Sequence, residues 1–277
     1  MPSTPPQSPT AKIPATKTAF VVMDTESIPD GKLINIVKYP GLGLSDEDAI
    51  ERARAEARAL SPTGSDFIHY TFQLPVAVCA ARVDIRFALQ SIRCIDAPLY
   101  RTREIATKFW NGLLNYADGA ALVTFNGRGF DLPMLELAAY RYGCSAKDYF
   151  TTRRKRFSAD IDLQDFMMNY GATRGFAGGL NLLAKLIGKP GKMGVSGDQV
   201  YEMFKQGKLQ EINDYCMFDT LDTYFVFLRT RVLTGDISSE REAEIIQKAR
   251  ETIAKEAEEH PALRVYLEAW TDGQPWP

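Results

Sequence analysis

The sequence contains few of the residues that build soft-metal and redox sites. Only two histidines occur in 277 residues, and the four cysteines are far apart along the chain with no CxxC pair. Each cysteine lies within an apolar stretch, so we expect reduced thiols in the core and not zinc ligands or disulfides. These four residues are Cys79, Cys94, Cys144 and Cys216.

Long apolar runs and a strong net charge are also absent. Runs such as Phe20 to Met23 and Val76 to Ala81 are much shorter than the ~20 residues needed to cross a bilayer, and the N-terminus lacks the apolar segment of a signal peptide. We therefore expect a soluble, cytoplasmic protein with no membrane partner. A net charge of −2 argues against an extended phosphate-binding surface. Any contact with nucleic acid should be local, and an acidic site that binds divalent cations fits this charge.

The composition predicts one enzyme-sized domain, because 45% hydrophobic residues are enough to bury one substantial α/β core. Residues 1–17 are rich in Pro, Ser, Thr and Ala without apolar periodicity, so we expect a disordered tail. The main domain should cover residues 18–235, with an insertion at 32–70, and residues 236–277 should form a helical C-terminal extension.

Apolar patterning and turn residues give the expected order of elements. A buried strand at Ala19 to Met23 ends at Asp24, and Pro29-Asp30-Gly31 predicts a turn after it. In the insertion, Ser45 is a possible N-cap for a helix that Pro62-Thr63-Gly64 closes. The remaining expected elements are a hairpin of strands at 75–83 and 87–95, a helix at 101–117, a strand at 120–125, a helix at 132–142, a short strand near 158–161, and helices at 213–233 and about 239–258.

This order of strand, hairpin, helix, strand and helix predicts a mixed α/β sheet whose second strand runs antiparallel. The layout is that of the ribonuclease H-like fold, here a mixed five-stranded sheet flanked by helices, with a helical C-terminal extension.

Three acidic segments are candidates for chemistry. Asp24-Thr25-Glu26 places two carboxylates at i and i+2, on one face of an extended strand, where both can reach shared ions. The second segment, FNGRGFD, leads from a strand through Asn126 and Gly127 to Asp131, which is also a possible helix N-cap. Alone, a DxE triplet is more often only a turn or a helix cap. In the second segment, a cap at Asp131 and a role in chemistry are compatible.

The third segment is YCMFD, in which Tyr215 and Asp219 stand one helical turn apart on the same face. Asp222 is a rival carboxylate, but the residue four positions before it is Phe218. Only Asp219 therefore has a tyrosine partner.

The ordered set MDTE, FNGRGFD and YCMFD resembles the DEDD exonucleases, specifically the tyrosine-bearing subclass that includes the proofreading domains of family B DNA polymerases. The chain most resembles stand-alone bacterial predicted 3′→5′ exonucleases related to that domain, which also carry a DL segment and a GKPGK-like loop. Here these are Asp160-Ile-Asp162-Leu163 and residues 188–192, so the resemblance spans about residues 19 to 232. A sister subclass uses a histidine base, yet neither His69 nor His260 stands just before Asp219.

The resemblance implies two-metal phosphodiester hydrolysis with two Mg²⁺ or Mn²⁺ ions, which suit all-oxygen ligands. Asp24, Glu26, Asp131 and Asp219 would be the metal ligands, and Tyr215 would orient the nucleophilic water. The substrate would be the 3′ end of a single-stranded nucleic acid, and the product a 5′-mononucleotide.

Substrate contacts are expected at Thr25, Asn126, Gly127, Phe130 and Lys192, where Phe130 could equally be a core residue. Two basic clusters, residues 153–156 and Lys185, Lys189 and Lys192, are either solvated faces or guides for a single strand. Two alternatives remain open: an RNA-trimming enzyme similar to ribonuclease D, and a non-catalytic module on the same fold that binds nucleic acid or a partner.

Overall fold

A mixed five-stranded sheet runs through the centre of the protein in the order β3-β2-β1-β4-β5. The computed structural model describes residues 17–115, 119–154, 160–173, 175–194 and 197–271. Within them, β2 pairs antiparallel with β1 and β3, while β4 and β5 run parallel to β1. The predicted ribonuclease H-like layout with an antiparallel second strand is therefore confirmed. The strands are β1 (Thr18–Pro29), β2 (Gln73–Asp84), β3 (Leu89–Cys94), β4 (Ala121–Thr124) and β5 (Ile161–Asp162).

Strand β1 is longer than the apolar run predicted. Its pairing with β2 continues to Pro29, so Asp24 and Glu26 lie inside the strand and not after its end. The predicted turn at Pro29-Asp30-Gly31 is instead the start of a helix, α1 (Gly31–Lys38), and the Asp30 side chain accepts a hydrogen bond from the Leu33 amide at 3.0 Å. An N-cap and a turn use the same residue types, which is why the sequence did not separate them.

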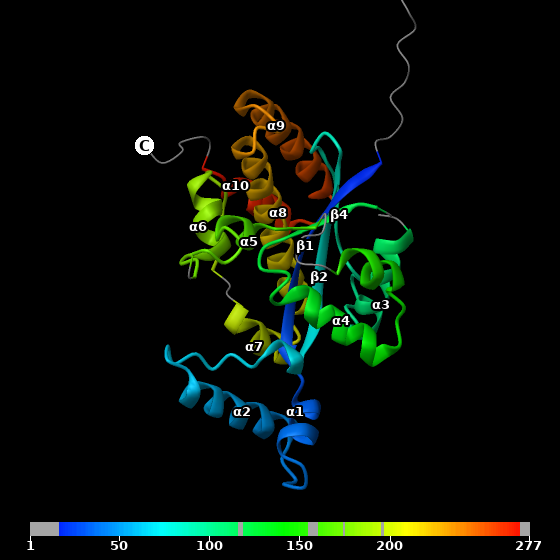
Figure 1. The fold of residues 1–277 in the computed structure, drawn as a ribbon, viewed down its shortest axis with the longest axis vertical. Coiled ribbons are helices and arrows are strands. Elements are labelled where there is room, and N and C mark those ends of the chain that lie inside the picture. The colour runs from blue at the N-terminus through cyan, green and yellow to red at the C-terminus, as the bar shows by residue number, and fades with distance from the viewer. Residues whose placement is uncertain (1–16, 116–118, 155–159, 174, 195–196, 272–277) are drawn as a thin grey trace, which may run out of the picture.

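Helices cover both faces of the sheet (Figure 1). Helices α3 and α4 pack together on one side, and α8 crosses β1 and β2 on the other, with α9 beside β3. The predicted helices at 101–117, 132–142, 213–233 and 239–258 are all present, but residues 116–118 lie outside the described part. The helices on the two faces are α3 (Thr102–Asn115), α4 (Asp131–Tyr142), α8 (Leu209–Leu233) and α9 (Ser239–Glu256); the others are α5 (Leu163–Met167), α6 (Gly179–Leu186), α7 (Val200–Lys205) and α10 (Ala262–Glu268).

The inserted segment at 32–70 lies at the end of the sheet toward which β1 runs (Figure 1). It contains α1 and a second helix, α2 (Asp46–Leu60), which pack on each other. The predicted N-cap at Ser45 is confirmed, since its side chain accepts a hydrogen bond from the Asp48 amide at 3.0 Å. The chain then passes through a loop and a short turn, Tyr70–Phe72, into β2. The insertion therefore stands beside the C-terminal end of β1.

The C-terminal helices are joined to the main core. Tyr266 of α10 is fully buried and donates a hydrogen bond to the equally buried Asp222 of α8 at 2.8 Å. The amine of Lys189 lies 3.8 Å from the centroid of the Trp270 ring. Polar and cation–π contacts as well as apolar packing thus hold the last segment against α8 and the loop before α7.

Three of the four cysteines meet in the core although they are far apart in sequence. Cys79 and Cys94 face each other on β2 and β3 with sulfur atoms 2.8 Å apart, and the Cys216 thiol donates to the backbone oxygen of Asp24 at 3.3 Å. Cys144 is only half-buried, so the prediction of core positions holds for the other three. Burial raises the pKa of the Cys79 and Cys216 thiols, which keeps them protonated.

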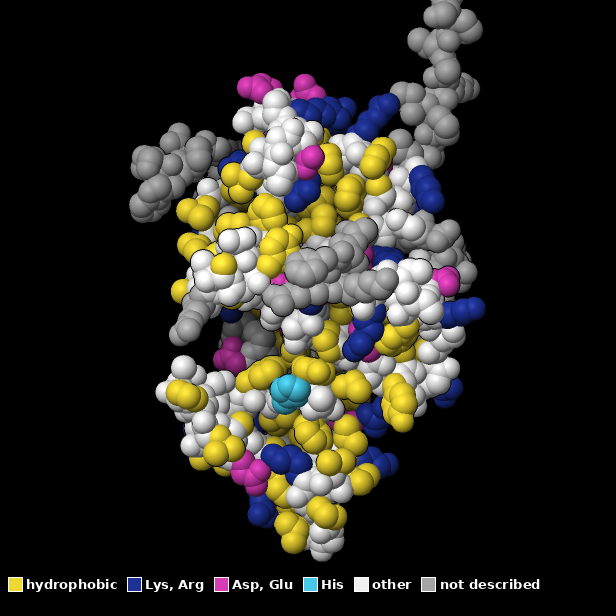
Figure 2. Space-filling view, in the orientation of Figure 1, with side chains coloured by type: hydrophobic (Ala, Val, Ile, Leu, Met, Phe, Trp, Pro, Cys, Tyr) yellow, Lys and Arg dark blue, Asp and Glu magenta, His cyan; other side chains and the backbone are white. Residues whose placement is uncertain are grey.

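The surface carries charges of both signs. Figure 2 shows Lys and Arg side chains scattered over the displayed face and no single large basic patch there. This agrees with the near-neutral net charge of −2. None of the helices in the described part of the chain is both long enough and apolar enough to cross a bilayer.

Candidate active site

Two carboxylates of β1 point toward the face covered by α8. Because side chains alternate along a strand, Asp24 and Glu26 share one face while Thr25 points to the other. Asp24 pairs in register with Cys79, and the pairing with β2 shifts after Glu26. Such an irregularity re-aims the strand locally. The parallel pairing with β4 ends at Val22, so the loop after β4 approaches β1 next to these carboxylates.

Helix α8 brings the third carboxylate. Asp24, Glu26 and Asp219 each offer one oxygen, and these three oxygens lie within 4.8 Å of one another. Tyr215 stands one turn before Asp219 on the same helix face. Burial raises the pKa of its phenol, and the charges of Asp219, Glu26 and Asp24 raise it further. The structure therefore brings four of the five predicted catalytic side chains together.

The fifth, Asp131, lies beside this group without joining it. The sequence allowed Asp131 to be the N-cap of α4, but it is the first residue of that helix. The N-cap is Phe130, whose side chain makes no capping hydrogen bond. The Asp131 carboxylate instead accepts a hydrogen bond from the Thr25 hydroxyl at 2.5 Å. Its negative charge raises the pKa of both Asp24 and Glu26.

Burial and mutual repulsion make this carboxylate group costly without a counter-charge. Burial is the main cause that raises the pKa of Asp24 and Glu26 well above their ordinary values, and the neighbouring carboxylates add to it. Burial also raises the pKa of Asp131 and of Asp219 to about 6. The charge of Lys192 opposes the shift at Glu26 and at Asp219. Clustered carboxylate oxygens of this kind suit a hard divalent cation such as Mg²⁺ or Mn²⁺.

The loop between β4 and α4 has a fixed shape. Asn126 adopts a left-handed backbone conformation with φ of 62°, and a Cβ at Gly127 would lie 2.4 Å from the Cβ of Thr124, so no side chain fits there. Asp162 accepts hydrogen bonds from the amides of Asn126 and Arg128, both at 2.9 Å. The DL segment thus places the loop that ends in Asp131. The sequence indicated this segment only through the family resemblance and assigned Asp162 no role.

The family model described as a predicted 3′-5′ exonuclease related to the exonuclease domain of PolB matches residues 65–270. The chain belongs to this family. The matched range contains Asp131, Tyr215 and Asp219 as well as α9 and α10, and it begins after β1, so Asp24 and Glu26 precede it. A search of curated proteins found no match.

The predicted substrate residues of this family member are either buried or at least partly open to solvent. Thr25 is buried with its hydroxyl on Asp131, and Gly127 is buried in the turn. Asn126 and Lys192 are exposed, and Phe130 is half-buried with its ring 5.6 Å from that of Phe67. Phe130 therefore stands at the surface of the site and is not enclosed in the core.

Most of the predicted basic clusters are engaged in structural contacts. Lys189 is only 7% exposed and lies against aromatic rings, so the proposal that it guides a strand is wrong. Arg153 pairs with Asp160 at 2.5 Å, and Arg154 pairs with Glu136 at 2.9 Å. Residues 155 and 156 of that cluster lie outside the described residues. Lys185 and Lys192 are exposed, and of these two it is Lys192 whose charge acts on Glu26 and Asp219.

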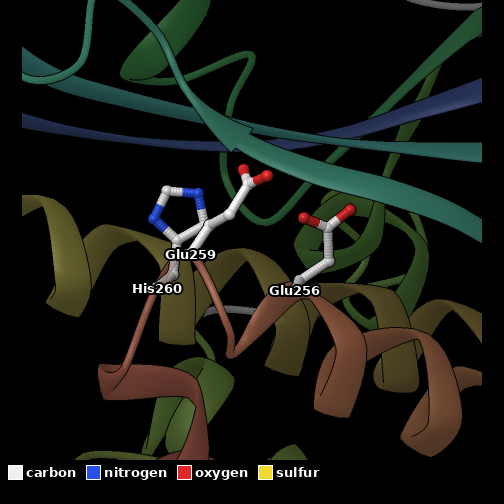
Figure 3. Close-up of side chains that lie close together, drawn as sticks. All are labelled: Glu256, Glu259 and His260. Carbon is white, nitrogen blue, oxygen red and sulfur yellow. The ribbon is translucent and has the colours of Figure 1, made fainter.

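A second group of possible metal ligands lies at the end of α9. Glu256, Glu259 and His260 also offer ligand atoms within 4.8 Å of one another, and Figure 3 shows their side chains side by side. Glu256 forms an ion pair with Arg93 of β3, and Glu259 is exposed. The other histidine, His69, is exposed and caps the short turn before β2. We interpret the α9 group as a contact between that helix and the sheet.

Proposed function

We propose that this protein is a metal-dependent 3′→5′ exonuclease that removes 5′-mononucleotides from single-stranded nucleic acid, with DNA favoured. One observation carries the proposal: Asp24, Glu26 and Asp219 come from distant parts of the chain and place their oxygens within 4.8 Å of one another. The membership of a predicted exonuclease family supports the same activity.

The residues present fit two Mg²⁺ or Mn²⁺ ions. Asp24, Glu26 and Asp219 would hold the first ion, Asp24 would be shared with the second, and Asp131 would contact the second through water. Bound ions would activate the attacking water and stabilise the charge on the departing 3′ oxygen. The donors are all carboxylate oxygens, which these cations prefer over softer ligands.

Tyr215 would orient the nucleophilic water and would not act as a base. Burial raises its pKa above the ordinary value, and the charge of Asp219 raises it further. The phenol therefore keeps its proton at neutral pH and acts as a hydrogen-bond donor. Its place one helical turn before Asp219 puts it at the edge of the carboxylate group.

The strand end would lie along the loop before α4. Asn126 and Gly127 would approach the backbone of the terminal nucleotide, Phe130 would stack on its base, and Lys192 would meet a phosphate. Thr25 would act through Asp131, whose carboxylate it holds at 2.5 Å. The description of the family as related to PolB supports DNA over RNA.

The test is an end-labelled degradation assay. Purified protein with Mg²⁺ or Mn²⁺ and a 5′-labelled single strand should give a ladder that shortens from the 3′ end, whereas a 3′-labelled copy should release labelled mononucleotide at once. EDTA should stop both reactions. Matched DNA and RNA oligomers separate a DNA enzyme from an RNA-trimming one. If all strands stayed intact with either metal, the exonuclease proposal would be wrong, and the alternative of a non-catalytic binding module would remain.

A further inference from the structure

A cavity of about 560 Å³ adjoins the carboxylate group on the side of the inserted segment. It follows β1 from Glu26 to Pro29, a length of about 10 Å at the ordinary rise of a strand. That length and volume suit one nucleotide. Its other walls come from α2, from the loop after α2, from Phe130, and from α7 with the loop before it, so the inserted segment supplies five of its 14 lining residues.

Phe67 supplies an exposed aromatic wall of this cavity. Its side chain is 57% exposed although it is a large apolar group, and its ring lies 5.6 Å from that of Phe130. Phe130 immediately precedes Asp131. The two rings together present stacking surface beside a proposed metal ligand, and an exposed aromatic ring such as that of Phe67 in a cavity is typical of a binding site.

The loop that carries Phe67 is held in place by hydrogen bonds. The Ser61 hydroxyl accepts from the Ser65 amide at 3.0 Å, and the Ser65 hydroxyl accepts from the Phe67 amide at 3.3 Å. The next residue, Ile68, is buried and anchors the loop, and its carbonyl accepts from Gln73 at 2.8 Å. The backbone at Phe67 is thus held in place before any ligand arrives, which lowers the entropic cost of binding.

Charges of both signs line the cavity. Its cations are Lys192 and Arg54, and its carboxylates are those of Glu26, Asp66 and Asp198. Lys192 also lines the neighbouring cavity that contains Asp219, so it stands beside the carboxylate group, where it could meet a phosphate. The Arg54 guanidinium of α2 lies 5.0 Å from the centroid of the Tyr201 ring of α7.

We propose that the inserted segment completes the substrate site, with Phe67 and Phe130 holding the unpaired 3′-terminal base of a single strand. This inference rests on the proposed function and deepens it. Phe67 is then a binding residue supplied by the insertion, Lys192 meets the phosphate next to the carboxylates, and the contact between Arg54 and Tyr201 bounds the cavity beyond the base.

The proposal can be tested by measuring binding while the protein and the DNA are changed separately and then together, as in a double-mutant cycle. EDTA is present so that no hydrolysis occurs. Fluorescence anisotropy of a 5′-labelled DNA strand should show about ten-fold weaker binding for Phe67→Ala, in line with the stacking of one base. Removal of only the 3′-terminal base should weaken binding to the unaltered protein by a similar factor. The two changes together should cost no more than either alone, and Phe67→Trp should bind normally. Tyr140→Ala is the matched control, because Tyr140 is 89% exposed on α4 and does not line the cavity.

The outcomes separate this inference from the proposed function. If the protein shortens strands but Phe67→Ala binds like Tyr140→Ala, or the two losses simply add, the inference is wrong and the exonuclease proposal stands. If the unaltered protein neither binds nor shortens any strand, both fall. Thermal melting of each variant checks the fold, and the exposure of Phe67 predicts little change.

Discussion

Two groups of possible metal ligands have similarly short distances between their ligand atoms, but the groups differ in how the fold assembles them. Both Asp24, Glu26 and Asp219, and Glu256, Glu259 and His260, bring ligand atoms within 4.8 Å of one another. The first group joins a central strand to a helix from the other end of the sequence. The second comes from one short stretch at the end of α9.

Their surroundings differ as much as their origins. In the first group, burial raises the pKa of every carboxylate, and Lys192 provides only partial relief. In the second group, Arg93 neutralises Glu256, and Glu259 is open to water. Proximity of carboxylates is common at a surface. Desolvated, repelling carboxylates that long-range topology forces together are a much stronger indication of a metal site.

The largest expected effect separates the two groups by activity. Asp24→Asn should lower the rate of strand shortening at least about 1,000-fold, because the change removes the carboxylate that we propose both ions share. Glu256→Gln should change the rate less than about two-fold, as expected for a surface ion pair. Single-turnover rates with Mn²⁺ measure both, and circular dichroism confirms folding. A folded, fully active Asp24→Asn protein would contradict the proposed site.

A smaller effect is expected from the side chain next to the carboxylates. Tyr215→Phe should lower kcat about 100-fold with little change in KM, because it loses the donor that orients water but keeps the ring. His260→Asn, the corresponding change in the α9 group, should leave both constants unchanged. Steady-state kinetics on one labelled DNA strand test the pair. Equal losses in the two variants would show that Tyr215 has no special position.

The smallest expected effect is a change of stability with pH, which follows from the raised pKa values of the site carboxylates. Asp131 and Asp219 have a pKa raised to about 6 from an ordinary value of 3.8, so between these pH values the folded protein binds more protons than the unfolded chain. The free energy of unfolding should therefore fall as the pH rises through this range, and the loss should persist above it. Without metal, we expect the melting temperature to be about 3 °C lower at pH 8 than at pH 5.

Metal and matched variants sharpen that measurement. Mn²⁺ should raise the melting temperature more at pH 8 than at pH 5, because it binds the ionised carboxylates. Asp24→Asn should weaken both the pH trend and the Mn²⁺ effect, while Glu256→Gln should preserve them. If Glu256→Gln, and not Asp24→Asn, abolished the rise in melting temperature with Mn²⁺, the metal would bind at the α9 group.

The strand and helix order could be predicted from sequence because apolar periodicity reports local geometry. The hairpin of β2 and β3 and the helix with its Ser45 cap are examples. Helix α1 was missed because Asp30 and Gly31 indicate a turn and a helix start equally well. The length of β1 was also missed, since it depends on pairing with β2 out to Pro29, which no local pattern contains.

The carboxylates of the site could be predicted from the sequence, but the contacts that surround and position them could not. The three ordered motifs and the family resemblance indicated Asp24, Glu26 and Asp219, and the structure brings them together. The burial of Lys189 against Trp270 depends on a contact between residues far apart in sequence. The role of Asp162 likewise appears only when its carboxylate is seen to accept two amides of the loop before Asp131.

The hydrogen bond from Tyr266 to Asp222 bears on how the protein can be shortened. Asp222 lies on the same helix as Tyr215 and Asp219, one turn beyond the latter, and Tyr266 is its donor from α10. A chain cut after α8 would leave that carboxyl group facing an emptied apolar surface, so expression fragments should keep the last helix even though it carries no proposed ligand.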